Sequence, residues 1–215
     1  MKRILVFGDS NSWGYTDEDN GQRYEKRWPI LLSQELIQKG FNTEIIEDCL
    51  PGRTTNIDDP QDGIHLNGAK VLKSSLLSHS PIDLVILMLG TNDLKFRFQR
   101  TAENIADGIK ELIQIVLDTN SGSGGWHDVN KSNLVVICPP SLGEKSYDPN
   151  WINFKEWEGG LEKSTELHFS FEKVCSQMGV HLIDANEFCQ SSSIDPIHWS
   201  KKMHLKFSEN LANII

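Results

Sequence analysis

Residues 82–89 read Ile-Asp-Leu-Val-Ile-Leu-Met-Leu, and Gly90-Thr91-Asn92-Asp93 follows directly. Apart from Asp83 the stretch is apolar throughout, without any alternation of polar and apolar residues. Such a run is typical of a strand whose two faces are both covered by helices, as in a parallel sheet. It therefore predicts a central strand of an α/β domain, with a polar turn at the carboxyl end of that strand.

The other apolar segments alternate between strand-like runs and stretches with helical periodicity. Strands are expected at residues 4–7, 43–47, 82–89, 134–138 and 180–183. Helices are expected at residues 28–40, 67–77, 101–117, 162–178 and 200–215, with Thr101 as an N-cap. This order predicts an α/β fold with a three-layer αβα arrangement, in which helices cover both faces of a five-stranded parallel sheet.

Two segments interrupt the alternation. Residues 121–131 are rich in Gly and Ser and are expected to form a surface loop. Residues 141–160 contain Trp151 and Phe154 and are long for a connection of this kind, and long loops in compact domains are often functional. No linker separates two domains, so residues 1–215 are expected to form a single domain.

The composition argues against several classes of partner. The chain has 21 Lys+Arg and 30 Asp+Glu, a formal net charge of −9, whereas nucleic acids and anionic membranes require a basic face. No apolar run approaches the roughly 18 residues of a membrane helix, and the run at residues 4–7 is too short for a signal peptide. The four cysteines show no metal-ligand spacing. We therefore expect a cytoplasmic protein with reduced cysteines, no bound cofactor and no metal.

Candidate functional residues follow the predicted strands. In open α/β sheets, ligand sites form beyond the carboxyl ends of the strands, and these ends meet at one edge of the sheet. Four small or polar blocks occupy such positions and are expected to converge: Gly8-Asp9-Ser10-Asn11, Pro51-Gly52-Arg53-Thr54-Thr55, Gly90-Thr91-Asn92-Asp93 and Asp195-Pro196-Ile197-His198.

These blocks contain the side chains needed for acyl transfer. A serine hydroxyl such as that of Ser10 needs a nearby base, and His198 can supply one. Asp195, three residues before the histidine, can reach the imidazole and orient it. Backbone N–H groups of Ser10 and Gly52 and the side-chain amide of Asn92 could stabilise an oxyanion. Taken singly, Ser10 could equally be a helix N-cap and His198 a surface histidine, so their predicted convergence carries the argument.

In this order, from residue 8 to residue 198, the four blocks resemble the SGNH/GDSL hydrolase family. Residues 50–60 and 84–93 are similar to its arylesterase/acetyl esterase branch, which includes enzymes with perhydrolase and acyltransferase activity. The resemblance implies the SGNH hydrolase fold, with a flavodoxin-like sheet, and a serine esterase that acts on short-chain acetyl or aryl esters. It implies these roles: Ser10 as nucleophile, Asp195 and His198 as its triad partners, and Ser10, Gly52 and Asn92 as oxyanion donors.

Some positions depart from the family pattern or carry weaker expectations. Asn11 stands where Leu is usual, Tyr15 where transferase-active members have Trp, and Pro196 where Gly is common. Arg53 is expected to be exposed, either to bind a substrate anion or to pair with Asp58-Asp59. His204 is expected to be structural, and the family's oligomers imply a homo-oligomer. The substrate pocket is expected to involve Asn11, Trp13, Tyr15, Arg53, Trp151 and Phe154.

Other functions are compatible with the same residues. Within the family, an acyl-CoA thioesterase or a lysophospholipase would use the same triad on a different small-molecule ester. A metal-dependent hydrolase could use Asp195, His198 and His204. A non-catalytic flavodoxin-like binding module could hold a phosphate at the Gly8-Asp9-Ser10 turn, although no GxGxxG motif or P-loop lysine follows the first strand.

Overall fold

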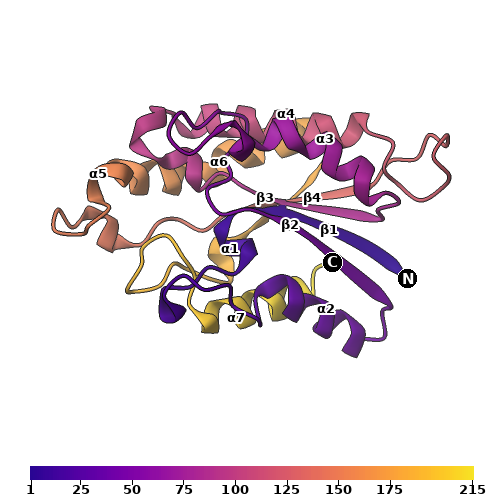
Figure 1. Cartoon of the computed structure of the whole chain (residues 1–215), viewed down its shortest axis with the longest axis horizontal. Helices are drawn as coiled ribbons and strands as arrows, with labels where there is room; N and C mark the ends of the chain where they lie inside the picture. The colour runs from indigo at the N-terminus through magenta and orange to yellow at the C-terminus, as the bar shows by residue number, and fades with distance from the viewer.

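Five parallel strands form the centre of the molecule in the order β2-β1-β3-β4-β5 (Figure 1). The structure is a computed structural model that describes all residues from 1 to 215. The strands are β1 (Lys2–Gly8), β2 (Thr43–Cys49), β3 (Leu84–Met88), β4 (Asn133–Cys138) and β5 (His181–Asp184). The flavodoxin-like order and the five-stranded parallel sheet confirm the fold expected from the sequence.

Helices cover both faces of this sheet (Figure 1). One face carries α3 (Gly68–His79), α4 (Ala102–Asp118) and α6 (Gly160–Met178). The opposite face carries α2 (Trp28–Gln38) and α7 (Lys201–Leu211). Two one-turn helices, α1 (Ser10–Trp13) and α5 (Phe154–Trp157), lie in the connections. Short 3-10 turns occur at Asp17–Asp19, Ile64–Leu66, Asn92–Leu94, Phe96–Phe98, Glu144–Tyr147 and Ala185–Glu187.

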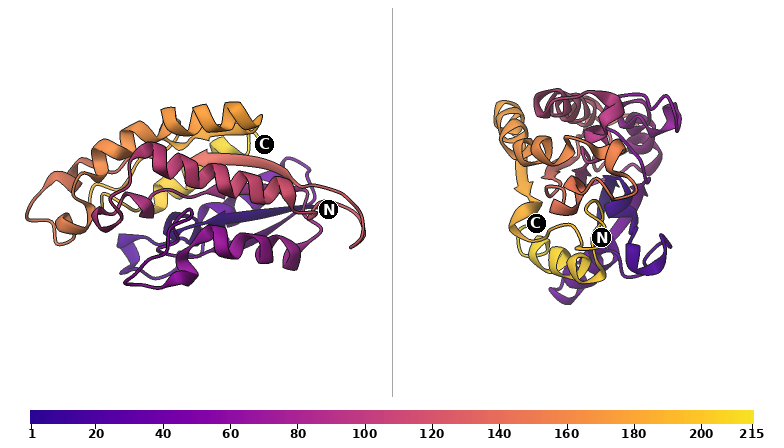
Figure 2. Two further views of the ribbon diagram at one scale, coloured as in Figure 1. Left: turned by 90° about the horizontal axis from the view of Figure 1, so that it is seen from above. Right: turned by 90° about the vertical axis from the view of Figure 1, so that its left-hand side faces the viewer.

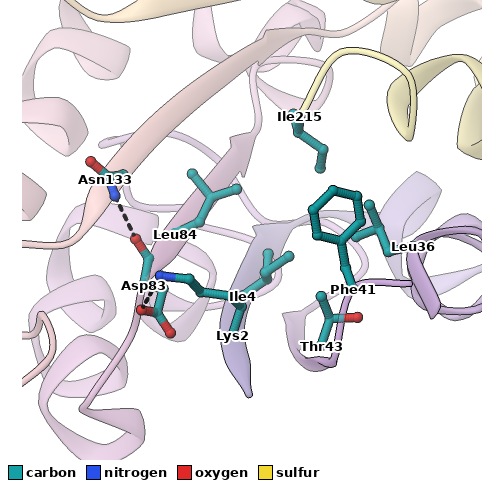
Figure 3. A pocket seen from close by; sticks show the side chains of 9 residues that line it. All are labelled: Lys2, Ile4, Leu36, Phe41, Thr43, Asp83, Leu84, Asn133 and Ile215. Carbon is teal, nitrogen blue, oxygen red and sulfur yellow. Dashed lines mark hydrogen bonds and ion pairs between the residues drawn. The ribbon is translucent and has the colours of Figure 1, made fainter. Parts of the chain in front are cut away.

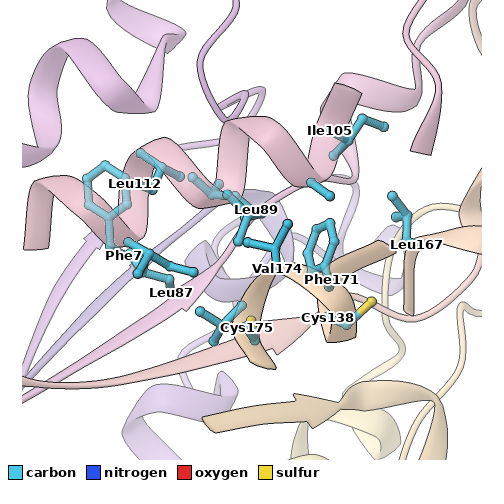
Figure 4. Packing of buried hydrophobic residues seen from close by; sticks show 14 of the residues in the cluster. Phe7, Leu87, Leu89, Ile105, Leu112, Cys138, Leu167, Phe171, Val174 and Cys175 are labelled. Atoms are coloured by element: carbon cyan, nitrogen blue, oxygen red, sulfur yellow. The ribbon is translucent and has the colours of Figure 1, made fainter. Parts of the chain in front are cut away.

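The central strands are buried on both faces, as their unbroken apolar sequence predicts. Successive side chains of a strand point to opposite faces of the sheet. On β3, Leu87 packs under α4 and α6, whereas its neighbour Ile86 packs towards α2 and α7. Figure 4 shows the first of these two cores, in which Phe7 and Leu87 of the sheet meet Leu112 of α4 and Phe171 of α6. The sheet is thus shared between two hydrophobic cores.

Local sequence signals account for most helix boundaries. Thr101 caps α4 in a reciprocal arrangement, because its hydroxyl accepts from the N–H of Asn104 and the Asn104 side chain accepts from the N–H of Thr101. Ser200 caps α7 in the same position, but this helix ends at Leu211 rather than at residue 215. Residues 141–160 are not wholly irregular, since they contain α5 and a 3-10 turn.

The strand register brings the polar blocks to one edge of the sheet. Gly8, at the end of β1, pairs with Cys49 of β2 on one side and with Met88 of β3 on the other. The residues that follow these three positions therefore leave the sheet at the same level. The chain turns outward to β2 and then returns to β3 on the other side of β1, which makes this edge the topological switch point where ligands bind in such folds.

The opposite edge of the sheet has a different character. Both termini lie at that end of the molecule (Figures 1 and 2). A cavity of about 220 Å³ opens there, lined mainly by apolar side chains that include Leu36, Phe41 and Ile215 (Figure 3). None of the four polar blocks contributes to its lining. No helix in the structure is both long enough and apolar enough to span a bilayer.

Candidate active site

Ser10 lies at the start of a one-turn helix directly after β1. Asp9, not Ser10, is the N-cap of α1, and its Oδ1 accepts a hydrogen bond from the N–H of Asn11 at 3.1 Å. The reading of Ser10 as an N-cap is therefore wrong. Gly8 is needed for this sharp turn, because a Cβ atom there would lie 2.4 Å from Oγ of Ser12. The turn leaves Ser10 as the first residue of the helix, with its hydroxyl at the helix N-terminus.

The structure brings Ser10, His198 and Asp195 into one hydrogen-bonded chain, although Ser10 and His198 are 188 positions apart. Nε2 of His198 lies 3.1 Å from Oγ of Ser10, and Nδ1 lies 2.6 Å from Oδ2 of Asp195. A neutral imidazole can donate from Nδ1 to the carboxylate and accept the serine proton at Nε2. This arrangement has the geometry of a nucleophile, a base and an orienting carboxylate.

Asp195 is held in its ionised form. Burial alone would raise the pKa of this carboxyl, but hydrogen bonds and the charge of His198 lower it below the ordinary value. The other oxygen of Asp195 accepts from the backbone N–H of Ile197 at 2.8 Å and of His198 at 3.3 Å. The carboxylate therefore shapes the turn that carries His198 as well as contacting its ring.

Three donors converge on the same edge of the sheet. The backbone N–H groups of Ser10 and Gly52 make no hydrogen bond within the protein. Gly52 lies in the turn after β2 and adopts φ +86°, a left-handed conformation that favours glycine. Nδ2 of Asn92 donates to the carbonyl oxygen of Arg53 at 3.1 Å, which leaves its second N–H for another acceptor. These are the groups that the sequence suggested as oxyanion donors.

A buried ionic network that the sequence analysis did not identify joins two of the blocks. Asp93 is fully buried and accepts from the N–H of Thr55 at 2.9 Å and from its hydroxyl at 2.6 Å. The guanidinium of Arg100 donates to the same carboxylate at 2.7 Å. Burial nevertheless raises the pKa of Asp93, and Arg100 and Thr55 only partly offset this effect. The only signal in the sequence was a carboxylate directly after Asn92.

Arg53 differs from both of its expected roles. The residue is only 4% exposed, and its guanidinium lies over the ring of Phe7 at 4.0 Å from the centroid. It donates to the Asp48 carboxylate at 2.8 Å and to the Gly8 carbonyl at 3.3 Å. The predicted exposure and the predicted pairing with Asp58-Asp59 are wrong, because the turn folds Arg53 back between the ends of β1 and β2. Asp59 pairs instead with Arg97.

The other expected pocket residues divide into two groups. Tyr15 lies against the candidate triad, since its ring centroid is 4.0 Å from that of His198. Trp13 is half-buried on α1, with the Arg23 guanidinium 5.4 Å from its ring centroid.

The second group consists of Asn11, Trp151 and Phe154. Asn11 is 1% exposed and bonds to backbone groups of the His198 loop. Trp151 packs against the core, and Phe154 lines a separate hollow of about 210 Å³ with Tyr147 and Trp157.

His204 is fully buried, and no hydrogen bond joins its side chain to the candidate triad. Its Nδ1 accepts a hydrogen bond from the backbone N–H of Trp28 at 3.2 Å. Burial lowers the pKa of this imidazole to about 3, so the ring is neutral at ordinary pH. No group of three or more His, Cys, Asp or Glu side chains is arranged to hold a metal ion, and Asp195, His198 and His204 do not form one.

Asp9, beside Ser10, has a strongly perturbed carboxyl pKa. Burial raises its pKa to about 6, against the lowering effect of the Asn11 N–H and of His198. Its Oδ2 has no hydrogen-bond partner in the protein. The side chain is thus a helix cap that takes up a proton more readily than an ordinary aspartate.

Comparison with known proteins agrees with this geometry. Residues 6–206 match the GDSL-like lipase/acylhydrolase family. The chain is similar to a carbohydrate acetylesterase from Sinorhizobium meliloti (36% identity, TM-score 0.88) and to an aryl esterase from M. smegmatis (38%, 0.88). In both comparisons the alignment covers 100% of this chain and 98% of the other chain.

A curated arylesterase from Vibrio mimicus is 29% identical over 147 residues, which are 68% of this chain and 60% of that protein. The matched segment therefore spans less than two thirds of this relative's length. The family match extends over nearly the whole chain and includes all four polar blocks. The chain therefore belongs to the GDSL-like lipase/acylhydrolase family of carboxylic ester hydrolases.

Proposed function

We propose that this chain is a serine esterase that hydrolyses short-chain acetyl or aryl esters through an acyl-enzyme on Ser10. The observation that carries the proposal is the hydrogen-bonded chain from Oγ of Ser10 through His198 to Asp195, with separations of 3.1 Å and 2.6 Å. The descriptions of the relatives, an aryl esterase and a carbohydrate acetylesterase, support acetyl and aryl groups as the substrate class.

In the first half-reaction, Oγ of Ser10 bonds to the ester carbonyl carbon while Nε2 of His198 takes the hydroxyl proton. The carbonyl electron pair moves onto oxygen, where the N–H groups of Ser10 and Gly52 and the Asn92 amide donate hydrogen bonds. The anionic carboxylate of Asp195 stabilises the imidazolium. Collapse breaks the bond to the alcohol, which leaves with the proton from Nε2.

In the second half-reaction, a water molecule gives its proton to Nε2 of His198 and attacks the acyl carbon. The same donors hold the second oxyanion, and collapse returns the proton to Ser10 and releases the carboxylic acid. An alcohol or a peroxide can replace water in this step. We therefore include acyltransferase and perhydrolase side activity in the proposal.

Substitution of the nucleophile tests the mechanism. Ser10→Ala should lower kcat for p-nitrophenyl acetate by several orders of magnitude and abolish labelling by a fluorophosphonate. Ser12→Ala is the matched control, since this hydroxyl lies in the same helix, is buried and has no hydrogen-bond partner. Near-normal turnover by the Ser10→Ala protein would reject the assignment, as would insensitivity of the unsubstituted protein to the fluorophosphonate.

A substrate panel separates the proposal from its alternatives. Acyl esters from C2 to C12 should be hydrolysed with a preference for the shortest chains, and a competing alcohol should divert part of the acyl group. A preference for acyl-CoA or lysophospholipids would favour those branches of the family, and no turnover at all would favour a binding module. The homo-oligomer and the cytoplasmic location stay predictions, and sedimentation velocity tests the first.

A further inference from the structure

Asn11, the residue directly after Ser10, has a side chain that is turned into the protein. It is 1% exposed, so its amide is not available to a ligand. Nδ2 donates to the carbonyl oxygen of Ile197 at 3.2 Å, and Oδ1 accepts from the backbone N–H of Trp199 at 3.1 Å. Both partners are buried, and they lie 186 and 188 positions along the chain.

The two partners of Asn11 lie on either side of His198. A primary amide that donates to one C=O and accepts from the N–H two residues further along pairs with the backbone as a neighbouring strand would. The orientation of the amide is determined by these bonds, since the opposite orientation would bring oxygen to oxygen and N–H to N–H. Asn11 therefore takes the place of a sheet partner for a segment that has none.

The segment that carries His198 is otherwise irregular, between β5 and α7. Other backbone groups of this segment are also hydrogen-bonded. Asp195 accepts from the N–H groups of Ile197 and His198, and the His198 carbonyl accepts from the N–H of Ser192 at 2.8 Å. With the two bonds from Asn11, the backbone is held both before and after the histidine. An unpaired buried group at either position would be unfavourable, because burial removes the water that could replace the lost hydrogen bond.

Asn11 is itself rigidly placed relative to the nucleophile. It follows Ser10 in α1, and its backbone N–H is held by the carboxylate of Asp9. The path from Oγ of Ser10 to Nε2 of His198 through the protein is therefore short: one peptide unit, one side-chain amide and the backbone next to the histidine. A shift of the Asn11 side chain would therefore change the 3.1 Å separation between Oγ of Ser10 and Nε2 of His198.

We propose that Asn11 is a positioning residue that sets His198 against Ser10, and not a residue of the substrate pocket as its place in the sequence suggested. The inference rests on the proposed function, in which His198 is the base for Ser10. It assigns to Asn11 an effect on turnover rather than on substrate binding. Displacement of a catalytic group by about 1 Å can cost on the order of 10²-fold in rate.

The test uses Asn11→Leu, which has a similar size but cannot form either hydrogen bond. The expected result is a 10- to 100-fold lower kcat with KM changed by less than about twofold, and a proportionally slower reaction of Ser10 with a fluorophosphonate. Asn11→Ala removes the same bonds without adding bulk, and it carries the test if the Leu variant does not fold. An unchanged kcat, or a loss confined to KM, would overturn the proposal.

Two further measurements separate positioning from general destabilisation. Ser121→Ala is the stability control, because it removes a buried hydrogen bond to Ser132 at the opposite edge of the sheet. It should lower the melting temperature with kcat unchanged; an equal loss of kcat in this variant would contradict the inference.

The second measurement is the proton NMR signal of Nδ1–H of His198, which should shift or broaden in the Asn11 variants. This readout does not require turnover. If the unsubstituted protein proves inactive, the proposed function fails while a changed signal still supports positioning by Asn11. An unchanged signal overturns the positioning role alone.

Discussion

Asn92 shows how a single side chain can be oriented by one bond and left free for another. Its Nδ2 donates to the carbonyl of Arg53, and this carbonyl is in turn fixed by the burial of the Arg53 side chain over Phe7. The second N–H of the amide remains for an oxyanion. At this scale the candidate site is a set of side chains whose orientation depends on partners in other blocks.

Asn92→Ala should lower kcat for short esters by about 10²–10³-fold with little change in KM, because the lost hydrogen bond strengthens in the transition state. Steady-state kinetics with p-nitrophenyl acetate provides the measurement. A variant that raised KM at constant kcat would place Asn92 in substrate binding instead.

His204 makes the stability of the fold sensitive to acid. Its pKa in the folded protein is about 3, below the ordinary value of 6.5. Between these values the unfolded chain binds a proton at this ring and the folded chain does not, so the free energy of unfolding decreases as the pH falls. The stability from this group is fully present above pH 6.5 and is lost progressively towards pH 3.

His204→Gln should flatten this dependence, since glutamine cannot take up the proton but offers an oxygen to the N–H of Trp28. Melting temperatures of both proteins between pH 7 and pH 4 provide the measurement. At pH 7 the variant is expected to have a lower melting temperature, because its packing is changed. Its melting temperature should then fall less steeply as the pH decreases. Parallel curves would show that His204 does not account for the acid sensitivity.

At the scale of elements, α4 packs closely on the polar segment 51–55 that follows β2 and contains Gly52. Gly108 of α4 faces Thr55, and a Cβ atom at this position would lie 2.1 Å from the Thr55 hydroxyl oxygen. The absence of a side chain therefore permits the contact between a helix and the Thr55–Asp93 pair. The helix thereby supports the site without contributing a functional side chain to it.

Gly108→Ala should destabilise the protein by about 1–3 kcal/mol through overpacking, although the same change in an exposed helix interior would stabilise it by about 1 kcal/mol. Ester turnover should fall with it, because Thr55 and Asp93 are displaced. Urea unfolding measures the first effect and kinetics the second. Asp107→Ala, at the exposed neighbouring position, is the control and should leave both unchanged.

At the scale of the whole molecule, one sheet supports two hydrophobic cores. Phe171 of α6 is fully buried in one core, and Phe207 of α7 is fully buried in the other. Alternate residues of β1, β3 and β4 contribute to both cores. Loss of either core exposes one face of the shared sheet, so the two helical layers are expected to unfold together.

Phe171→Ala and Phe207→Ala should therefore each lower the free energy of unfolding by about 3–5 kcal/mol. In both variants the whole protein should still unfold in one common transition. Far-UV circular dichroism and tryptophan fluorescence should give coincident curves in both variants. Phe169→Ala is the control, since this side chain is 72% exposed. Separate transitions by the two probes would contradict a single domain across residues 1–215.

The sequence predicted the architecture well because apolar periodicity is a local property. The unbroken run of residues 84–89, the helical stripe of α4 and the cap at Thr101 each depend on neighbours in the chain. The polar blocks after the strands could also be predicted to lie together, since all strands of a parallel sheet have their carboxyl ends at one edge. Helix ends were less accurate, because fraying depends on tertiary packing.

By itself the sequence determined a parallel α/β sheet and the four polar blocks at its carboxyl edge. Only the tertiary structure decided which side chains of those blocks face the site and which hold it together. Arg53 and Asn11 were expected to face a ligand, yet both are buried, and Asn11 bonds to residues more than 180 positions away. The physical reason is that a hydrogen bond needs a partner within about 3 Å, and which distant segment lies at that distance is decided by how the helices and loops pack on the sheet.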